Sequence, residues 1–381
     1  MKNVNYSVLE AVCRKGKGDR YVELQNSVGQ RWYIPLRNSS VHLSLFQPSS
    51  IQGKFVAYFF DIIKHFPILL HIIHAKIVQL QFTKEFQEFV DDIFRVSHCN
   101  FGIFCGSPGY HQKPTLLISK RERILGYCKL TNNKNIMELF HNESKSLAYL
   151  HDKDINSIPT SLFCGNLPFN QQTWAFVQTT CRERSVQFAT YTNQKLYDFV
   201  KEVNTKTKVS IPFCESDFSK SLDKLKQHLF LLEDKNMQNT LRNGIKAVNA
   251  NQNSFKYFCA SHGDFTPWNS FIVRNRLFAF DLEYFKYSFA PFHDFFHFFT
   301  QEMLYNKYAN AKQIYLKYKN LRSLFFKNQD NVDLFYLSYL LMIVEFYLNR
   351  DKGILNDRIK ECMDIWASLI KYILKDVSEN N

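Results

Sequence analysis

Three side chains in one stretch of the sequence, Asp264, Asn269 and Asp281, have the types and spacing needed to handle a metal-bound phosphate. Two short apolar segments, Ser270–Val273 and Leu277–Phe280, lie between the last two of these residues and predict a tight hairpin. Antiparallel strands of equal length return the chain to its starting level, so Asn269 and Asp281 should converge at the open end of the hairpin. Amide and carboxylate oxygens are hard ligands of the kind that Mg²⁺ takes together with substrate phosphates.

Asp264 precedes Asn269 by five residues, in a loop that contains Gly263 and Pro267. A carboxylate beside a metal-bound phosphate can accept the proton of an attacking hydroxyl and orient that hydroxyl in line. Taken without its surroundings, the Asp-x-x-x-x-Asn spacing favours a simpler interpretation. In that interpretation Asp264 caps the following turn and Asn269 satisfies backbone groups.

A resemblance to a known family rests on two motifs, His262-Gly-Asp-Phe-Thr-Pro-Trp-Asn269 and Asp281-Leu-Glu283. They are similar to the catalytic loop and metal-binding segment of the aminoglycoside phosphotransferase and choline kinase family. The surrounding sequence also resembles bacterial members from cell-surface polysaccharide pathways. The resemblance implies an α+β, bilobal protein-kinase-like fold with a small β-rich N-lobe and a larger helical C-lobe. It covers residues 97–300 with recognisable motifs.

The family resemblance implies an ATP-dependent phosphotransferase, or kinase, that acts on a hydroxyl group and uses Mg²⁺. In this interpretation Asp264 is the catalytic base, while Asn269 and Asp281 hold the metal. Glu283 either approaches the metal as well or supports the hairpin.

Two further residues are assigned to structural support of the catalytic loop by the same resemblance, His262 and Asp294. Asp294 lies in the aromatic segment Pro291–Phe299, where an unpaired carboxylate is costly, so it requires a partner. The neighbouring His293 and His297 are expected to be ordinary packing or surface histidines.

A glycine-containing segment, Cys105–Pro114, lies between two expected strands, as a nucleotide-covering loop does. Gly106 and Gly109 permit close backbone approach to a phosphate, and Lys113 adds positive charge. The spacing departs from Gly-x-Gly-x-x-Gly, so an ordinary hairpin turn is the alternative.

Lys129 is a charged residue inside an apolar strand, and its side chain could simply reach solvent. The resemblance instead pairs it with the nucleotide phosphates and a helix carboxylate, for which Glu143 is the first candidate and Glu138 the second. These two glutamates are five residues apart and do not share a helix face. The strand Trp174–Thr179 is implied to end at an adenine-contacting connection, which makes Gln178 a candidate nucleotide contact.

The pattern of apolar residues predicts short strands in the first half of the chain and helices in the second. The expected strands are Tyr21–Leu24, Arg31–Pro35, Phe101–Cys105, Pro114–Ser119, Ile124–Leu130 and Trp174–Thr179. The expected helices are two within Gln52–Phe94, broken near Pro67, then Asn135–Leu150, Gln194–Val203, Lys220–Glu233, Met237–Val248, Ala309–Phe326, Val332–Leu348 and Asp357–Lys375. We therefore predict an α/β N-terminal extension of unknown role (1–96), a kinase-like N-lobe (97–182) and a helical C-lobe (183–381).

The composition is that of a basic protein: 381 residues with 48 Lys plus Arg against 35 Asp plus Glu, a formal charge of +13. The basic segment Arg14–Arg20 contains two glycines and could cradle a phosphate, although a flexible turn needs no ligand. Nine cysteines without a Cys-x-x-Cys pair, and no apolar stretch behind the N-terminus, indicate a cytoplasmic protein with no zinc site. No segment reaches the ~20 consecutive apolar residues of a transmembrane helix.

The positive net charge also ranks the possible partners. It disfavours a polycationic acceptor, so we expect a small hydroxylated acceptor that is neutral or acidic, such as a phosphorylated, uronic or lipid-linked sugar. No nucleic-acid recognition module is evident, whereas peripheral contact with a membrane is compatible with the basic surface. The alternative function is a catalytically weak, kinase-like binding or scaffold protein at an anionic glycan or membrane surface.

Overall fold

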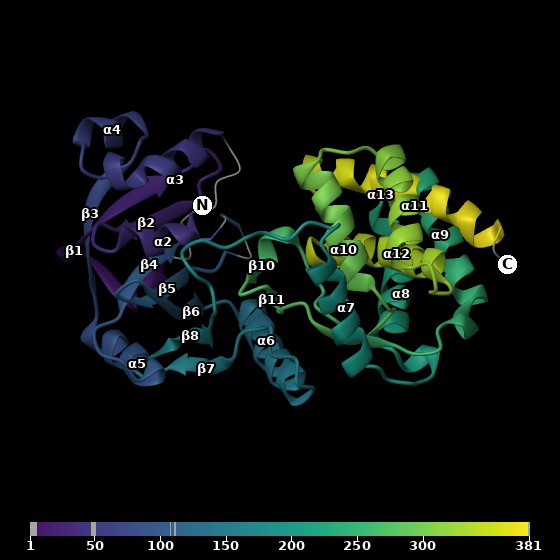
Figure 1. The fold of residues 1–381 in the computed structure, drawn as a ribbon, viewed down its shortest axis with the longest axis horizontal. Helices are drawn as coiled ribbons and strands as arrows, with labels where there is room; N and C mark the ends of the chain where they lie inside the picture. Colours follow the sequence, from purple (N-terminus) through teal and green to yellow (C-terminus); the bar gives the residue numbers. More distant parts are fainter. Residues whose placement is uncertain (1–5, 47–50, 107, 110–111, 380–381) are drawn as a thin grey trace. The chain divides into compact units, whose positions relative to one another are not determined.

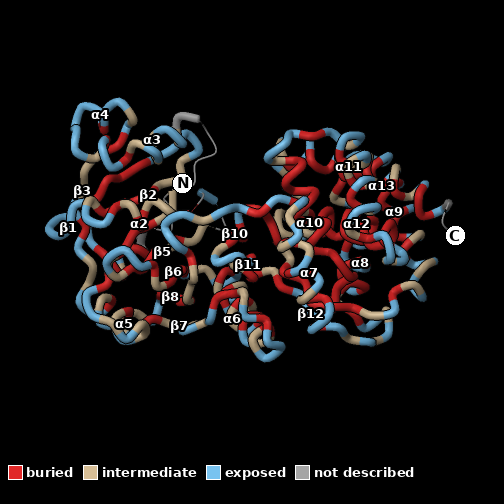
Figure 2. Tube along the Cα trace, viewed as in Figure 1, coloured by how far each residue is buried: buried red, intermediate tan, exposed pale blue. Residues whose placement is uncertain are grey.

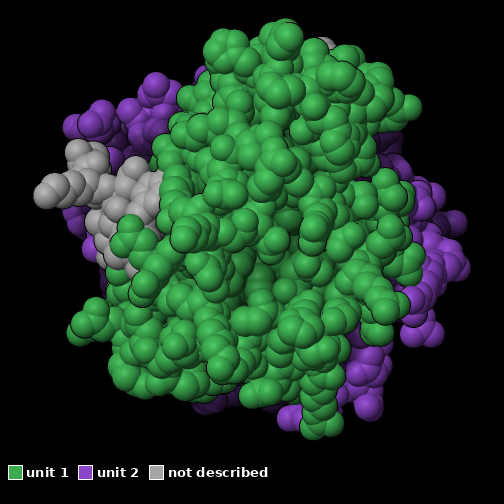
Figure 3. Space-filling view, turned by 90° about the vertical axis from the view of Figure 1, so that its left-hand side faces the viewer, with its two compact units in different colours: residues 1–149, 158–186 green, residues 150–157, 187–381 purple. Residues whose placement is uncertain are grey.

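The structure is a computed structural model that describes residues 6–46, 51–106, 108–109 and 112–379. Its contacts divide the chain into two compact units, coloured separately in Figure 3. The sheet unit comprises Met1–Tyr149 and Ile158–Val186, and the helical unit comprises Leu150–Ser157 and Gln187–Asn381. An antiparallel sheet dominates the first unit and helices dominate the second, so the expected α+β class is confirmed.

An eight-stranded antiparallel sheet forms the frame of the sheet unit, with the strand order β3-β1-β2-β4-β5-β6-β8-β7 (Figure 1). Its strands are β1 (Cys13–Gln25), β2 (Arg31–Pro35), β3 (Lys76–Phe82), β4 (Asn100–Phe104), β5 (Thr115–Lys120), β6 (Arg123–Thr131), β7 (Ser161–Leu167) and β8 (Asn170–Thr179). The helices are α1 (Tyr6–Glu10), α2 (Ser39–His42), η1 (Leu43–Leu45), α3 (Ile51–Ile63), α4 (Pro67–Ile72), α5 (Lys84–Phe94) and α6 (Lys134–Asp152). The last turn of α6 belongs to the helical unit.

Helices cover both faces of the β1–β2–β3 part of the sheet. Tyr21 packs in one apolar cluster with Phe86 of α5, whereas its neighbour Val22 packs in another with Phe60 of α3 and Leu70 of α4. Successive side chains of a strand point to opposite faces, so the two clusters lie on opposite sides of the sheet. Burial on both faces accounts for the run of apolar residues in β1 and β2.

One part of the predicted secondary structure is wrong. Helical spacing was expected throughout Gln52–Phe94, but Lys76–Phe82 forms the edge strand β3, antiparallel to β1. The break near Pro67 is confirmed, because α3 ends at Ile63 and Pro67 opens α4. A short apolar run fits a strand as well as a helix turn, and pairing with β1 decides between them.

Two further elements, β7 and helix α10 (His293–Gln301), were not predicted from the sequence.

Residues 1–96 contribute β1, β2 and β3 to the same sheet as the later strands. The predicted boundary at residue 96 therefore falls inside one sheet and does not separate two sheets. That residues 1–96 have a role of their own stays a prediction. The basic segment Arg14–Arg20 lies within β1, where the pairing with β3 shifts between Lys15 and Asp19. Gly18 is required in this bulge, because its φ is +135° and a Cβ there would meet the carbonyl oxygen of Leu80 at 2.3 Å.

The helical unit contains mostly α-helices and two small antiparallel strand pairs. Its helices are α7 (Gln194–Lys206), η2 (Phe213–Glu215), α8 (Asp217–His228), η3 (Leu229–Leu231), α9 (Lys235–Ala250), η4 (Gln252–Ser254), η5 (Pro267–Asn269), α10 (His293–Gln301), the π-helical turn η6 (Glu302–Asn306), α11 (Ala311–Phe325), α12 (Val332–Arg350) and α13 (Asp357–Glu379). Its strands pair as β9 (Cys259–Ser261) with β12 (Lys286–Phe289), and β10 (Ser270–Val273) with β11 (Arg276–Ala279). The predicted helices of this region are confirmed to within a few residues at their ends.

Helix α12 is the central helix of this unit and is drawn almost wholly as buried in Figure 2. By length and composition it could cross a membrane, with a mean hydropathy of 1.3, but 83% of that window is buried inside the structure. It packs against α8, α9, α10 and α13. A helix that is apolar on all sides is expected at such a position, so core packing accounts for its composition.

Candidate functional site

The Asp264 carboxylate is held at both of its oxygens. The Nδ2 group of Asn269 donates to its Oδ2 at 3.1 Å and to the backbone carbonyl of Asp264 at 2.9 Å. On the other side, Nε2 of His297 lies 3.2 Å from Oδ1. The side chain is nevertheless 31% exposed. It is therefore oriented by its neighbours and still accessible to a ligand.

The hairpin predicted after Asn269 is confirmed, with a shorter turn than expected. Strands β10 and β11 pair directly, and the turn consists of Arg274 and Asn275, both with positive φ (48° and 65°), as a two-residue hairpin requires. At the open end, the N–H of Phe280 donates to the carbonyl of Asn269 at 3.1 Å. The next residue, Asp281, has a φ of 70°, a strained conformation that packing must maintain.

Oxygen atoms suited to a divalent cation lie at this end of the hairpin. A carboxylate oxygen of Asp281 and one of the buried Glu283 lie within 4.8 Å of each other. Because the amide nitrogen of Asn269 donates to Asp264, its oxygen is the atom that can act as a ligand. Two carboxylates so close repel each other, and a cation bound by both offsets that repulsion. Such an all-oxygen donor set fits Mg²⁺.

Asp294 braces the backbone of the loop that carries Asp264. Its carboxylate accepts a hydrogen bond from Oγ of Ser261 at 2.7 Å and from the N–H of His262 at 2.8 Å, with a longer contact of 3.4 Å from the N–H of Gly263. The side chain is only 6% exposed and lies in the first turn of α10. A helix N-terminus favours a carboxylate, and the loop amides are the partners that its burial requires.

The ring of His262 connects the loop to the hairpin. Its Nδ1 accepts a hydrogen bond from the N–H of Asp264 at 3.4 Å, and its Nε2 lies 2.9 Å from the carbonyl oxygen of Phe280. Since a carbonyl can only accept, Nε2 carries the proton in this arrangement. His262 thus has contacts that orient the loop rather than contacts that suit a base.

His297 is the site residue that sequence reasoning missed. It was expected to be a packing or surface histidine, but it contacts Asp264 directly and its side chain is only 2% exposed. The available signal was its spacing from Asp294: residues three apart share one face of a helix, so α10 directs both side chains at the same loop. His293, in contrast, is a packing residue: burial, followed by the neighbouring charge of His297, lowers its pKa to about 3.

Gly263 is required by the tight packing of the loop. Its φ is +84°, and a Cβ at this position would lie 2.2 Å from the carbonyl oxygen of Tyr284. Any side chain would push the loop away from the segment that carries Asp281 and Glu283. The glycine therefore sets how closely the Asp264 loop and the segment of Asp281 and Glu283 approach within this unit.

The sheet unit contains a separate charged pair. Nζ of Lys129 in β6 lies 2.6 Å from Oε2 of Glu143 in α6, with side-chain exposures of 7% and 0%. Lys129 also lies 5.5 Å from the ring centre of Phe176, its partner in the β6–β8 register. Glu138, the second candidate, is exposed. The lysine is therefore held inward by the pair and does not simply reach solvent.

The predicted nucleotide-covering loop is described only in part, because Ser107, Tyr110 and His111 lie outside the described residues. Gly106 has a φ of +78° and packs so closely that a Cβ would meet the backbone of Lys113 at 2.9 Å. Gly109 has a φ of +148° and open space around it. The segment thus connects β4 to β5 through a turn that requires glycine, and Lys113 lies where it re-enters the sheet.

Gln178 lies one residue before the end of β8, paired with Tyr127 of β6. Its side chain is 2% exposed. It is therefore buried within the sheet unit, and any contact with a nucleotide would involve the backbone at the end of the strand.

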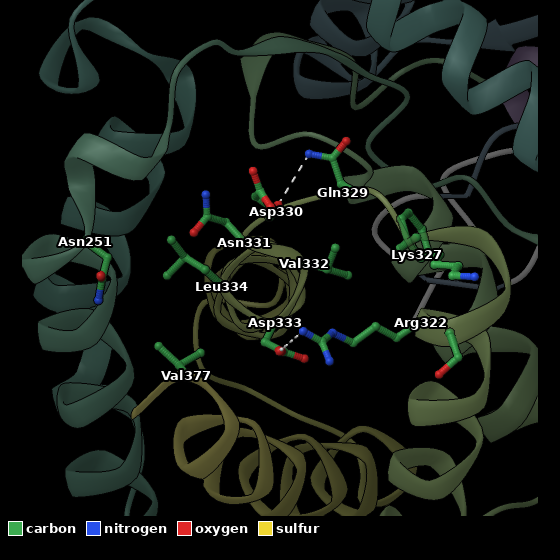
Figure 4. Close-up of a pocket in the computed structure, with 12 residues that line it drawn as sticks. Asn251, Arg322, Lys327, Gln329, Asp330, Asn331, Val332, Asp333, Leu334 and Val377 are labelled. Carbon is green, nitrogen blue, oxygen red and sulfur yellow. Dashed lines mark hydrogen bonds and ion pairs between the residues drawn. The ribbon is translucent and has the colours of Figure 1, made fainter. Parts of the chain in front are cut away.

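A large cavity of about 930 Å³ lies elsewhere in the helical unit (Figure 4). Its lining includes Arg322 and Asp333, whose side chains form an ion pair at 3.2 Å, together with Lys327 and Gln329. None of the residues assigned to phosphate chemistry lines it. The chemistry of the Asp264 loop, rather than the size of this cavity, therefore identifies the candidate site.

Comparisons with known proteins give similarity in structure alone. No family model matches the sequence, and no curated protein matches it. A ternary complex of a thermostable mutant of aminoglycoside phosphotransferase APH(4)-Ia with ADP and hygromycin B is similar at 10% identity and a TM-score of 0.48, covering 76% of this chain and 97% of that one. ADP-bound APH(2'')-Ib is similar at 14% identity and a TM-score of 0.45, covering 75% of this chain and 97% of that one.

A third solved structure, a complex of APH(2'')-IIia with GDP and kanamycin, has 13% identity and a TM-score of 0.44. The match covers 78% of this chain and 100% of that one. At these identities and TM-scores the likeness supports no conclusion about activity. The assignment of a function depends on the residues of this chain.

Proposed function

We propose that this protein is an ATP-dependent phosphotransferase that transfers the terminal phosphate of ATP to a hydroxyl group of a small molecule or glycan precursor in the cytoplasm. The observation that supports it most is the state of the Asp264 carboxylate. It is 31% exposed, yet it is oriented by Asn269 at 3.1 Å and by His297 at 3.2 Å. A carboxylate that only capped a turn would not need orientation at both oxygens together with access from solvent.

In the proposed mechanism Asp264 accepts the proton of the acceptor hydroxyl as that oxygen attacks the terminal phosphorus and the bond from this phosphorus to the leaving ADP breaks. Asn269 and Asp281, with Glu283, would hold Mg²⁺, which neutralises charge on the phosphates when bound. Lys129, positioned by Glu143 at 2.6 Å, would hold the phosphates of the nucleotide. Asp294 keeps the loop amides in place while Asp264 takes up the proton.

We propose further that the acceptor is a neutral or acidic sugar. Trp268 lies in the catalytic loop itself, is 40% exposed and packs edge-on against Tyr305 at 5.7 Å. The guanidinium of Arg358 lies 5.1 Å from the ring centre of Tyr305. An exposed aromatic ring suits the apolar face of a sugar, and an arginine suits a carboxylate or phosphate group. Arg358 already pairs with Glu361 at 2.9 Å, so an acidic group of the acceptor would compete with that carboxylate. The formal charge of +13 agrees with an acceptor that is not a polycation.

The proposal is tested by separating turnover from nucleotide binding. Asp264→Asn should lower turnover by about 100-fold or more, the usual contribution of a general base, with little change in nucleotide affinity. Asp281→Ala should weaken the binding of Mg·ATP itself, measured by calorimetry. Equal losses of nucleotide binding in both variants would show that the assigned roles are wrong.

The acceptor is tested by screening sugars, phosphorylated sugars, uronic acids, choline and aminoglycosides for phosphate transfer from Mg·ATP. Strong activity on a kanamycin-like cation would refute the acceptor class. If wild type and Asp264→Ala were equally inert with every acceptor while Mg·ATP still bound, the scaffold alternative would replace the enzyme.

A further inference from the structure

Helices α3 and α4 and the turn between them expose an unusual number of large apolar side chains. We call the surface that they form the α3–α4 face. Its members, with exposed fractions, are Phe55 (59%), Tyr58 (82%), Ile62 (56%), Phe66 (53%), Ile68 (77%), Leu69 (37%) and Ile72 (64%). Single exposed apolar residues are normal on a protein surface, but a contiguous set marks an interaction site.

These side chains are not needed to hold the helices on the sheet. Phe60 and Ile63 of α3 and Leu70 of α4 already pack into the core over β1 and β2, with exposures of 0%, 5% and 3%. Phe55 and Tyr58 lie on the other side of α3, three residues apart on one helix face. α3 is therefore apolar on two sides, and folding accounts for only one of them.

The outward side chains form an ordered surface. The ring of Phe55 packs against Phe59 at 4.5 Å, and that of Tyr58 packs against the same ring at 4.8 Å. α4 follows after a short turn and contacts α3 and the edge strand β3. In Figure 2 the α4 turn is drawn mostly in the colour of exposed residues. The face is thus an exposed apolar surface of the sheet unit.

The charge around the α3–α4 face is strongly one-sided. Between Glu23 and Glu85 the sequence contains a single acidic residue, Asp61, against six basic ones. The six are Arg31, Arg37, Lys54, Lys64, Lys76 and Lys84. Asp61 is itself neutralised by Lys64 at 2.8 Å and lies 3.8 Å from Arg184. Arg31 and Lys76 also lie 3.7 and 3.6 Å from the buried Glu23, and Lys84 lies 3.5 Å from Glu88. The basic groups still outnumber the carboxylates in this stretch, so the balance of charge favours an anionic surface.

We propose that the α3–α4 face docks the protein on an anionic phospholipid bilayer. An exposed surface of aromatic and branched apolar side chains with basic neighbours is suited to insertion among lipid headgroups, because the apolar side chains enter the acyl boundary while the basic groups contact phosphates. The inference does not depend on the proposed enzymatic activity.

The test is co-flotation of the full chain with vesicles of phosphatidylcholine, with and without phosphatidylglycerol. The wild type should float only with the anionic vesicles. Raising the ionic strength from about 0.1 M to about 1 M, which shortens the Debye length from about 10 Å to about 3 Å, should weaken binding. Replacing Lys54 with Gln should weaken it about fivefold, as one basic group near such a surface contributes.

The apolar contribution is tested with two matched triple variants. Tyr58→Ser, Ile68→Ser and Ile72→Ser together remove three exposed side chains of the face and should lower the partition coefficient about a hundredfold. The control variant replaces the equally exposed Tyr308, Leu324 and Ile354 (80%, 68% and 86%) by Ser and should bind as the wild type does.

Three outcomes would overturn the inference. The wild type could fail to float with anionic vesicles, or both triple variants could bind equally. In the third outcome, the wild type would be a dimer by light scattering and would not float, and the variant with Tyr58, Ile68 and Ile72 replaced would alone be a monomer. The α3–α4 face would then bind a second copy of the chain. Thermal unfolding of each variant establishes that the substitutions, all at exposed positions, leave the fold intact.

Discussion

Replacing Asp294 by Asn should loosen the loop that carries Asp264, the proposed catalytic loop, without unfolding the helical unit. The carboxylate accepts two short hydrogen bonds, from Oγ of Ser261 at 2.7 Å and from the N–H of His262 at 2.8 Å. Asn has nearly the same shape, but its amide has one acceptor oxygen and no charge. One of the two donors therefore loses its acceptor, the other keeps only an uncharged one, and the loop loses part of its support.

The size of the effect follows from these contacts. A hydrogen bond to a charged group contributes about 1.5–3 kcal/mol, and one such bond is lost while the other is weakened, so the loop should lose about 2 kcal/mol. The 3.4 Å contact with the N–H of Gly263 is too long to add much. A loss of about 2 kcal/mol corresponds to a local opening that is about 30-fold more frequent.

Hydrogen exchange followed by mass spectrometry measures this opening directly and needs no acceptor. The peptide that contains the amides of His262 and Gly263 should exchange about 30-fold faster in Asp294→Asn than in the wild type. Turnover should fall together with it, because the loop carries Asp264.

Asp333→Asn is the matched control. Asp333 is also buried (4% exposed against 6%), also lies in the first turn of a helix, and accepts from Tyr318 at 2.6 Å. This variant should lose similar stability in urea while exchange in the catalytic loop stays at the wild-type rate. Equal loop exchange in both variants would refute the bracing role of Asp294, because the effect would then be general destabilisation.

Three further predictions concern stability. Lys129→Met leaves Glu143 as a buried charge and should lower the free energy of unfolding, measured in urea, by about 3–5 kcal/mol. Adding Glu143→Leu should restore most of that free energy. A double variant as unstable as Lys129→Met would contradict the pairing. Burial lowers the pKa of His42 to about 3 from 6.5, so below pH 6.5 the unfolded chain binds a proton that the folded chain does not. This group should therefore lower the free energy of unfolding by about 2 kcal/mol between about pH 7 and about pH 5. If His42→Gln lost as much stability over the same pH range, His42 would not be the cause. Gly263→Ala should cost more than about 2 kcal/mol, because of its φ and the contact with Tyr284; wild-type thermal stability would show that the loop adjusts freely.

Features of the site that depend on short sequence separations could be predicted. Asn269 and Asp281 flank a hairpin whose two short apolar segments and intervening turn residues determine its register, so their approach was predictable. Asp264 lies five residues from Asn269, close enough for the connecting loop to keep the two side chains in contact. Lys129 was recognisable as a charge within an apolar strand, although the sequence alone left Glu143 and Glu138 as alternative partners.

Long-range packing decided the remaining features. The rotation of α6 over the sheet selects Glu143, and the placement of α10 brings His297 to Asp264, 33 residues away in the sequence. Pairing with β1 makes a strand of Lys76–Phe82, whose short apolar run is compatible with either structure.

The sequence by itself therefore determined the hairpin and the oxygen-bearing side chains at its open end. Backbone geometry over a few residues allows few other conformations. The tertiary structure alone decided which histidine contacts Asp264 and which glutamate is buried. It also decided that one side of α3 remains exposed. Each of these depends on how a helix is rotated against its neighbours, and that rotation is set by the packing of the whole core.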